Sequence, residues 1–188
     1  GTMTFASNTL TSAGSFDIFV LKYDTNGNEV WGKSLGNTST DIGTAIATDS
    51  TGNVFVTGYF QNTMTFASNT LTSAGGYEIF VLKYDTNGNE VWGKSLGGTS
   101  TDTGIGIATD SNGNVFVTGF FKNTMTFASN TLTSEAGGVD IFVLKYDTNG
   151  NEVWGKSIGG TDYDEGHAIA TDSNGNVYVT GWVKETMT

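Results

Sequence analysis

Residues 44–60 read TAIATDSTGNVFVTGYF, and residues 17–35 read DIFVLKYDTNGNEVWGKSL. In both stretches, two runs rich in Val, Ile, Phe, Tyr and Thr flank a short segment that starts with Asp and ends with Gly-Asn. β-Branched and aromatic residues favour strands, whereas Asn-Gly and Thr-Gly supply the positive φ of a tight turn. Each stretch therefore predicts a β-hairpin. The four expected strands are Thr44–Thr48, Asn53–Phe60, Asp17–Tyr23 and Glu29–Leu35.

This plan repeats along all 188 residues. The sequence TMTF occurs at residues 2–5, 63–66 and 124–127, so the period is 61 and then 62 residues, with Glu135 as the extra residue of the third copy. Near-identical copies at a fixed period are typical of repeat architectures. The chain starts and stops at the same phase, so we interpret it as a segment of a longer array. We expect one domain over residues 1–188, with repeats at 2–62, 63–123 and 124–185 and the start of a fourth at 186–188.

The composition excludes several classes of function. There is no Cys, so disulfide scaffolds, Cys-ligated zinc and thiol nucleophiles are excluded. The net charge is -11, all eight basic residues are Lys, and nucleic acid is therefore not an expected partner. The single His excludes a multi-His metal site, and no apolar run is long enough for a membrane helix. We expect no cofactor, no metal, no catalytic residue and no membrane partner.

The expected strands differ in which faces they bury. Asp17–Tyr23 is apolar on both faces, which is typical of a sheet covered on both sides. Thr44–Thr48 carries small residues, which suit an inner position where strands converge. Glu29–Leu35 mixes charge with one large aromatic, Trp31, which suits an outer edge. Thr2–Ser12 alternates polar and apolar residues and is expected to form a small hairpin or an irregular excursion. A small inner strand, two apolar middle strands and a polar outer strand predict an all-β fold of four-stranded antiparallel β-propeller blades.

The segments GTAIATDSTGNVFVTG (43–58) and DIFVLKYDTNGNEVWGKSL (17–35) resemble the SBBP-type β-propeller repeats of bacterial secreted and surface proteins. The resemblance covers all three copies. It implies a propeller fold, and a secreted or cell-surface location for the parent protein. It implies no reaction and no shared catalytic residues.

The phase of the repeat leaves two half-blades. With strands A to D running from the axis outward, the chain begins with a C–D pair at 17–35, continues through blades at 44–96 and 105–158, and ends with an A–B pair at 167–183. Two-stranded ribbons with an unpaired edge are marginal alone. Three blade equivalents are too few to close a ring, so the chain is its own expected partner. We expect a homodimer with six blades, closed between chains, and a trimer with nine as the second choice.

The turn at Asp24–Asn28 superficially resembles two known motifs. A calcium loop of the EF-hand type needs Glu eleven residues after the first Asp, and that position is Leu35. The turn also resembles the Asp-box hairpin of sialidases, but those enzymes hold the carboxylate of their substrate with several Arg, and this chain has none. Ordinary turn chemistry is the preferred interpretation. The recurring Trp31, Trp92 and Trp154 are assigned to packing between blades.

Differences between the copies cluster in the D-to-A and B-to-C connections, at 37–45, 15–17, 59–61 and their equivalents. Both connections emerge on one face of a propeller, where ligands usually bind. A diversified binding face and relaxed constraint on loops explain the differences equally well. The candidate ligand-binding residues are Tyr59, Phe120, Trp182, Asp162, Tyr163, Asp164, Glu165 and His167.

One acidic residue recurs in all three copies. Asp41, Asp102 and Asp164 are candidates for an acidic ring at the mouth of the channel that attracts a cation. The preferred alternative is that each Asp caps its own loop as an Asx turn. Glu165 beside His167 has the residue types of a metal ligand set or an acid–base pair, although simple drift at the rim is favoured.

Three functions are weighed. The leading hypothesis is a non-catalytic scaffold or binding module that assembles into a ring. The second is a lectin-like glycan binder that uses the aromatic and acidic loops. The third is a glycoside hydrolase, which requires an asymmetric pair of carboxylates. The near-identical copies offer symmetric rings, so the candidates for such a pair are Asp162, Asp164 and Glu165, of which Asp162 and Glu165 occur in the third copy alone.

Overall fold

The computed structural model describes residues 1–135 and 137–185, and every regular element in these residues is a β-strand. The predicted start of a fourth repeat at 186–188 lies outside the described residues. The strands are β1 (Thr2–Phe5), β2 (Asn8–Thr11), β3 (Ile18–Tyr23), β4 (Glu29–Leu35), β5 (Ile42–Thr48), β6 (Val54–Phe60), β7 (Thr63–Phe66), β8 (Asn69–Thr72), β9 (Glu78–Tyr84), β10 (Glu90–Leu96), β11 (Thr103–Thr109), β12 (Val115–Lys122), β13 (Thr124–Phe127), β14 (Asn130–Thr133), β15 (Val139–Tyr146), β16 (Glu152–Ile158), β17 (Glu165–Thr171) and β18 (Val177–Trp182).

Two complete antiparallel blades form the middle of the molecule. Blade I has the strand order β5-β6-β9-β10, and blade II has the order β11-β12-β15-β16. The predicted order from inner strand A to outer strand D is thereby confirmed, as is the fold class. The expected boundaries in the first copy are correct within two residues, the largest difference being that the inner strand begins at Ile42.

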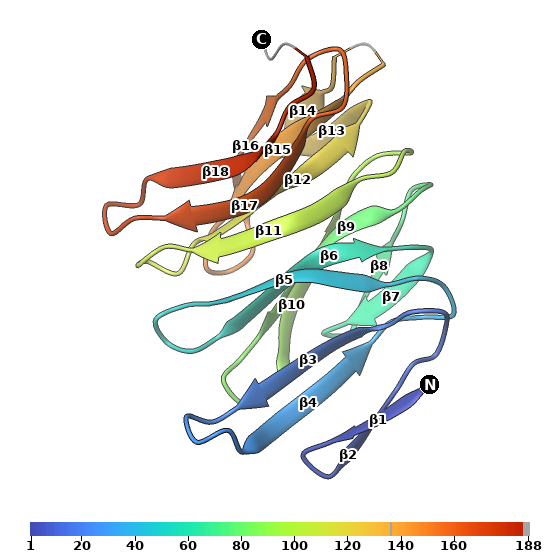
Figure 1. The fold of residues 1–188 in the computed structure, drawn as a ribbon, viewed down its shortest axis with the longest axis vertical. Helices are drawn as coiled ribbons and strands as arrows, with labels where there is room; N and C mark the ends of the chain where they lie inside the picture. The colour runs from blue at the N-terminus through green and yellow to red at the C-terminus, as the bar shows by residue number, and fades with distance from the viewer. Residues whose placement is uncertain (136, 186–188) are drawn as a thin grey trace.

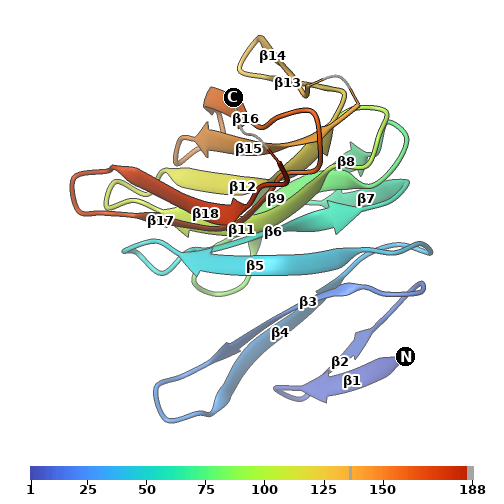
Figure 2. The ribbon, with the colours of Figure 1, turned by 45° about the horizontal axis from the view of Figure 1, so that its top comes forward.

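Two half-blades flank the complete ones. We call β3–β4 the N-terminal ribbon and β17–β18 the C-terminal ribbon, and among the described strands each ribbon pairs only within itself. Figures 1 and 2 show the two ribbons at opposite ends of the row of blades. The predicted C–D and A–B pairs are therefore present, and β3 and β18 each leave an edge unpaired. The described chain is an open arc of blades.

The inner strands meet side by side near the axis, where β5, β11 and β17 follow one another (Figure 1). The Thr44 hydroxyl donates to the Gly104 carbonyl at 2.7 Å, and the Thr109 hydroxyl donates to the Thr48 carbonyl at 2.8 Å. A Cβ added to Gly104 would collide with the side chain of Thr57. Small residues are therefore required on the inner strands, as their composition predicted.

Apolar layers fill the space between neighbouring blades. Trp31 lies in the layer between the N-terminal ribbon and blade I, and Trp92 lies in the layer between blades I and II. Their indole N–H groups donate to the carbonyls of Thr86 at 3.2 Å and Thr148 at 3.5 Å, in the C–D turn of the next blade. Trp154 is partly buried against the layer that joins blade II to the C-terminal ribbon. The assignment of these indoles to packing between blades is confirmed.

A small hairpin lies within each B-to-C connection, and a third precedes the N-terminal ribbon. The first consists of β1 and β2, so the expected hairpin at Thr2–Ser12 is confirmed. In blade I the ring of Phe66 lies over Gly93 on the outer strand. The contact is so close that a Cβ added to Gly93 would be 2.9 Å from Phe66 Cδ1. Glu90 on that strand accepts the backbone N–H of Ala67 at 2.7 Å. The hairpin therefore covers one face of the outer strand, which is the edge strand of its blade as predicted; this cover was not predicted.

The D-to-A and B-to-C connections lie on one face of the arc of blades. The A–B and C–D turns lie on the other face, which we call the turn face. In the first C–D turn, Asp24 Oδ1 accepts the backbone N–H groups of Asn26 and Asn28, each at 2.8 Å, and Oδ2 accepts the Asn28 amide at 2.7 Å. The side-chain hydrogen bond from Asn28 is the main reason that the pKa of Asp24 is lowered. Both carboxylate oxygens are occupied within the turn, which supports the turn chemistry over a calcium loop.

Candidate functional site

The D-to-A and B-to-C connections meet on one face, which we call the loop face. Asp41 is fully buried there, and its Oδ2 accepts the Asn37 N–H at 2.7 Å while Oδ1 accepts the Gln61 N–H at 3.3 Å. Each carboxylate of this kind thus ties a D-to-A loop to the end of strand B. The equivalent residues Asp102 and Asp164 are also fully buried and make the same two contacts with Gly98 and Lys122 and with Gly160 and Lys184.

The hydrogen bonds of Asp41, Asp102 and Asp164 to backbone N–H groups indicate a structural role for these carboxylates. Desolvation by burial raises the pKa of Asp102, although the Lys122 and Gly98 N–H groups oppose this shift. The carboxylates cap their own loops, as the preferred alternative expected, but not as Asx turns, because the N–H groups that they accept lie four residues earlier and twenty residues later in the chain. Whether they also act as an acidic ring in an assembled propeller stays a prediction.

A second set of carboxylates stands at the start of strand C, and the sequence interpretation did not single it out. Glu78 is 5% exposed, and Asp140 is 3% exposed. Burial raises the pKa of both, and the neighbouring charges of Asp102 and Asp164 raise them further. Asp140 Oδ1 is a buried atom without a hydrogen-bond partner among the described residues. Within that part of the chain, no group of three or more His, Asp or Glu side chains is placed to hold a metal ion.

Several predicted site residues form one aromatic cluster between blade II and the C-terminal ribbon. The rings of Phe120 and Tyr163 have centroids 5.4 Å apart, and Tyr163 stacks on Trp182 with centroids 5.2 Å apart and an interplanar angle of 17°. His167 meets Trp182 edge-on at 6.2 Å. Burial, followed by the charge of Glu165, raises the pKa of Tyr163 to about 12. The structure therefore brings together four of the aromatic or imidazole side chains that the sequence proposed.

Two ion pairs border this cluster. His167 Nε2 lies 2.9 Å from Glu165 Oε1, and Lys184 Nζ lies 2.7 Å from Asp162 Oδ1. The hydrogen bond from Lys184 is the main reason that the pKa of Asp162 is lowered. The expected neighbours Glu165 and His167 are in contact across a β-bulge of β17, where the register with β18 shifts between Gly166 and Ala168. Lys184, which neutralises Asp162, was not anticipated.

Tyr59 is placed apart from this cluster, on blade I. Its ring packs edge-on against Tyr77 with centroids 4.9 Å apart. Tyr77 immediately precedes β9, and the equivalent residues of the other copies are Phe16 and Val139. The sequence predicted that segment 15–17 varies between the copies. It did not single out Tyr77 and Val139, the equivalents of Phe16, as site residues.

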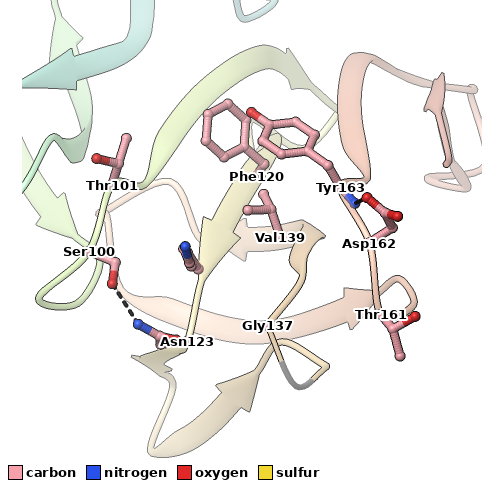
Figure 3. Close-up of a pocket in the computed structure, with 10 residues that line it drawn as sticks. Ser100, Thr101, Phe120, Asn123, Gly137, Val139, Thr161, Asp162 and Tyr163 are labelled. Carbon is pink, nitrogen blue, oxygen red and sulfur yellow. Dashed lines mark hydrogen bonds between the residues drawn. The ribbon is translucent and has the colours of Figure 1, made fainter.

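The loop face of blade II contains a pocket of about 730 Å³. Figure 3 shows the rings of Phe120 and Tyr163 beside each other above Val139, with Ser100 and Asn123 to one side and Asp162 to the other. The Asn123 amide donates to the Ser100 hydroxyl at 2.7 Å. The pocket thus has an aromatic wall, an aliphatic floor and a polar rim that includes the ammonium group of Lys122, which is the usual makeup of a small-molecule site.

Comparison with known families identifies the repeat. A family described as a β-propeller repeat, SBBP, matches residues 30–59, 91–119 and 153–182. Each match runs from the outer strand of one blade through the D-to-A loop to strand B of the next. The suspected family is confirmed, three times over, by segments that each contain one of the buried residues Asp41, Asp102 and Asp164.

Two relatives share more distant similarity. The chain is 26% identical, over 88% of its length, to the "Uncharacterized WD repeat-containing protein L264" of Acanthamoeba polyphaga mimivirus. It is 34% identical, over 57% of its length, to the "Regulatory protein FlaEY" of Caulobacter vibrioides. The aligned regions span 14% and 12% of these relatives. The similarity therefore concerns a segment of each relative.

Proposed function

Because the chain is built from three SBBP β-propeller repeats, we propose that it is a non-catalytic scaffold and binding module that closes into a six-bladed ring with a second copy of itself. The WD-repeat description of one relative favours a binding or scaffold role. The recurrent carboxylates bind backbone amides, which favours a structural role for them over an acid–base role. The observation that carries ring closure is a contrast in burial between equivalent strands.

The outer edge of the C-terminal ribbon exposes side chains that the complete blades bury. Tyr178 on β18 is 58% exposed, whereas its equivalents Phe55 and Phe116 are 0% and 1% exposed. Val179 is 38% exposed, whereas Val117 is 0% exposed. In the complete blades, strand C covers this edge. The sequence of β18 is therefore that of a strand with neighbours on both sides.

The N-terminal ribbon shows the matching contrast. Phe19 on β3 is 63% exposed, and its equivalents Phe80 and Phe142 are 0% exposed. Tyr23 is 55% exposed, and its equivalent Tyr84 is 1% exposed. Burying a side chain of this size contributes about 1.5–3 kcal/mol. Covering both edges thus supplies a substantial driving force for association.

A groove of about 390 Å³ separates β3 from β5. Phe19 and Tyr23 line one wall, and Ile46 and Val56 line the other. Ile46 is 56% exposed here, whereas Ile107, its equivalent in blade II, is 8% exposed against the preceding blade. An A–B pair of strands is what fills this position in the complete blades. The C-terminal ribbon of a second chain is therefore the proposed occupant.

Gly27, in the C–D turn of the N-terminal ribbon, lacks the Trp contact that its equivalents in the complete blades make. A Cβ added to Gly88 would lie 2.8 Å from the indole of Trp31, and one added to Gly150 would lie 2.8 Å from that of Trp92. At Gly27 nothing described lies within 4 Å. In the proposed ring, the turn of Gly27 covers Trp154 of the second chain.

The test is the solution mass by light scattering, with and without a charge at the proposed joint. Two chains of 19.8 kDa give 39.6 kDa, three give 59.4 kDa, and one gives 19.8 kDa. Val179→Lys is expected to shift a 39.6 kDa species to the single-chain mass, because the ring would bury the charge. Val153→Lys, at an exposed outer-strand position, is the matched control and is expected to leave the mass unchanged. A mass of 59.4 kDa would replace two chains by three, and a folded single chain of wild type would overturn closure.

A second candidate function is glycan binding on the loop face. The aromatic cluster and its polar border favour it, because sugars present both apolar C–H faces and hydroxyl groups. Binding to an array of immobilised oligosaccharides that saturates with protein concentration is the expected result. Silence across neutral and acidic glycans would contradict it. The outcome is independent of the solution mass.

A further inference from the structure

One position on the loop face differs in size between the blades. Tyr77 stands at the start of strand C in blade I and packs against Tyr59, with ring centroids 4.9 Å apart. In blade II the equivalent residue is Val139, and the aromatic partner at the end of strand B is Phe120. Val139 is one of the residues that line the 730 Å³ pocket. The pocket opens beside this smaller side chain, and the ring that contacts Phe120 is that of Tyr163, which stands where blade I has Thr101.

We propose that this pocket binds one neutral pyranose unit of an oligosaccharide, and that Val139 is the residue that admits it. The proposal rests on the glycan-binding function above and not on ring closure. It narrows that function from the whole loop face to one site in blade II.

The apolar wall suits the C–H face of a sugar ring. Phe120 and Tyr163 lie at 5.4 Å with an interplanar angle of 53°, so together they form an angled surface above Val139 (Figure 3). A pyranose has a face of C–H groups that packs on such a surface and an equator of hydroxyl groups that remain free to hydrogen-bond. The wall therefore selects for a ring with one apolar face.

The rim suits hydroxyl groups in preference to a charged ligand. Ser100 and Asn123 are already joined by a hydrogen bond of 2.7 Å, which orients the amide, and the Asn123 carbonyl oxygen and Ser100 hydroxyl retain the capacity to bind further. Asp162 is paired with Lys184 at 2.7 Å, so its charge is compensated. Lys122 also lines the pocket, and its ammonium group is a hydrogen-bond donor for sugar hydroxyls. The net charge of -11 of the whole chain disfavours acidic sugars. The expected ligand is therefore neutral.

Blade I shows that this space takes a six-membered ring with a hydroxyl group. Tyr77 is such a ring, supplied by the chain itself, and it lies against Tyr59 as a pyranose is proposed to lie against Phe120. The pocket volume exceeds that of one sugar unit, so a second unit of the oligosaccharide is expected to extend toward the rim. Two of the predicted ligand-binding residues therefore lie outside the proposed site. Tyr59 is covered by Tyr77 of its own blade, and Trp182 does not line the pocket.

The two blades provide their own matched variants. Val139→Tyr places the larger side chain of blade I in blade II. Tyr77→Val is the control in blade I, where Thr101 stands in place of Tyr163 and the second wall ring is therefore missing. Binding is measured by saturation-transfer NMR and calorimetry with methyl glycosides of glucose, galactose, mannose and N-acetylglucosamine and their disaccharides. N-acetyl-tyrosinamide is the second probe, because it presents the ring that blade I uses.

The expected results are a loss of at least tenfold in affinity for Val139→Tyr and an unchanged single site per chain for Tyr77→Val. Melting temperature and solution mass are expected to stay at wild-type values. Unchanged sugar binding in Val139→Tyr overturns this pocket while leaving glycan binding intact. A second site in Tyr77→Val overturns the role of Tyr163 in the wall. Wild type that binds N-acetyl-tyrosinamide and no sugar overturns the ligand class, and wild type that binds no sugar overturns the glycan function as well.

Discussion

The indole of Trp92 lies against the backbone of Gly150, so closely that a Cβ on this glycine would be 2.8 Å from indole Cδ2. Gly150 has φ +79° and belongs to the C–D turn of blade II, while Trp92 belongs to the outer strand of blade I. The pair joins two blades through one contact. It makes the turn glycine a packing residue as well as a turn residue.

Gly150→Ala is expected to lower the free energy of unfolding by about 2–4 kcal/mol, because left-handed strain and a steric conflict with Trp92 add. Gly175→Ala is the matched control. Gly175 has φ +82° and nothing described within 4 Å of an added Cβ, so only the strain of about 1 kcal/mol applies. Urea unfolding measures both. Equal losses in the two variants would contradict the packing role.

The proposed joint between chains has a defined register. In blade II, Phe116 lies opposite Lys145, and the same relationship places Tyr178 opposite Lys22 of a second chain. Directly opposed residues of antiparallel strands have Cα atoms about 4.5–5.5 Å apart, within the range of a disulfide. The double variant Tyr178→Cys with Lys22→Cys is therefore expected to form interchain disulfides under mild oxidation, seen on a non-reducing gel.

The chain has no Cys of its own, so the control for this cross-link is clean. Tyr178→Cys with Leu21→Cys moves one thiol to the opposite face of β3, because successive side chains of a strand alternate. This second pair is expected to cross-link far more slowly. Similar yields from both pairs would show that the chains do not meet in the proposed register.

A buried threonine links strands B and C in each complete blade. The Thr118 hydroxyl donates to the Phe142 carbonyl at 2.8 Å, and both groups are buried. Thr118→Val is expected to cost about 1 kcal/mol of folding stability, because a buried hydrogen bond is lost at nearly constant volume. Thermal unfolding at fixed protein concentration measures it.

Thr180 is the equivalent residue on the exposed edge of β18, and its proposed acceptor is the Phe19 carbonyl of a second chain. Thr180→Val is expected to weaken dimerisation by about thirtyfold, the equivalent of about 2 kcal/mol, because the two-chain ring contains two such joints. Sedimentation equilibrium measures this change. If Thr180→Val left the dissociation constant untouched while Thr118→Val destabilised the fold, the edge of β18 would not be paired as proposed.

Stability is expected to depend on pH in two opposed steps. Burial raises the pKa of Glu78 above 4.5 and that of Asp102 above 3.8, so the folded state takes up protons before the unfolded chain does as pH falls. The free energy of unfolding therefore increases from neutral pH toward the ordinary carboxyl range. Below pH 3.8 it decreases, because hydrogen bonds hold the pKa of turn residues such as Asp85 low.

Urea unfolding across pH 3–7 separates the two steps. Glu78→Gln keeps an acceptor for the Ala74 N–H, removes the buried charge, and is expected to flatten the increase toward acid pH. Asp85→Asn is expected to reduce the decrease below pH 3.8. Repulsion among the surface carboxylates contributes equally to wild type and Glu78→Gln to a first approximation. An identical pH profile in these two proteins would refute the role of the buried pair.

The local residue pattern predicted the blades well, because strand faces and turns depend on neighbours in sequence. Thr44–Thr48, with its small side chains, was placed at the axis, where the structure has it. The pairing of Tyr59 with Tyr77 and the cover of Gly93 by Phe66 depend on contacts across the fold, and neither partner is marked in the sequence. The variable segment 15–17 was recognised, but its effect on a cavity appears only when three blades are compared in space.

The difference between Tyr77 and Val139 bears on how such an array evolves. Duplication of a repeat adds a blade that folds on the pattern already present, and a few codons of the loop face then decide whether the new blade carries an open pocket. The number of ligand sites and the number of blades can thus vary independently. A lineage that gains or loses repeats is able to adjust the number of its ligand sites by point mutation, without redesigning the blade.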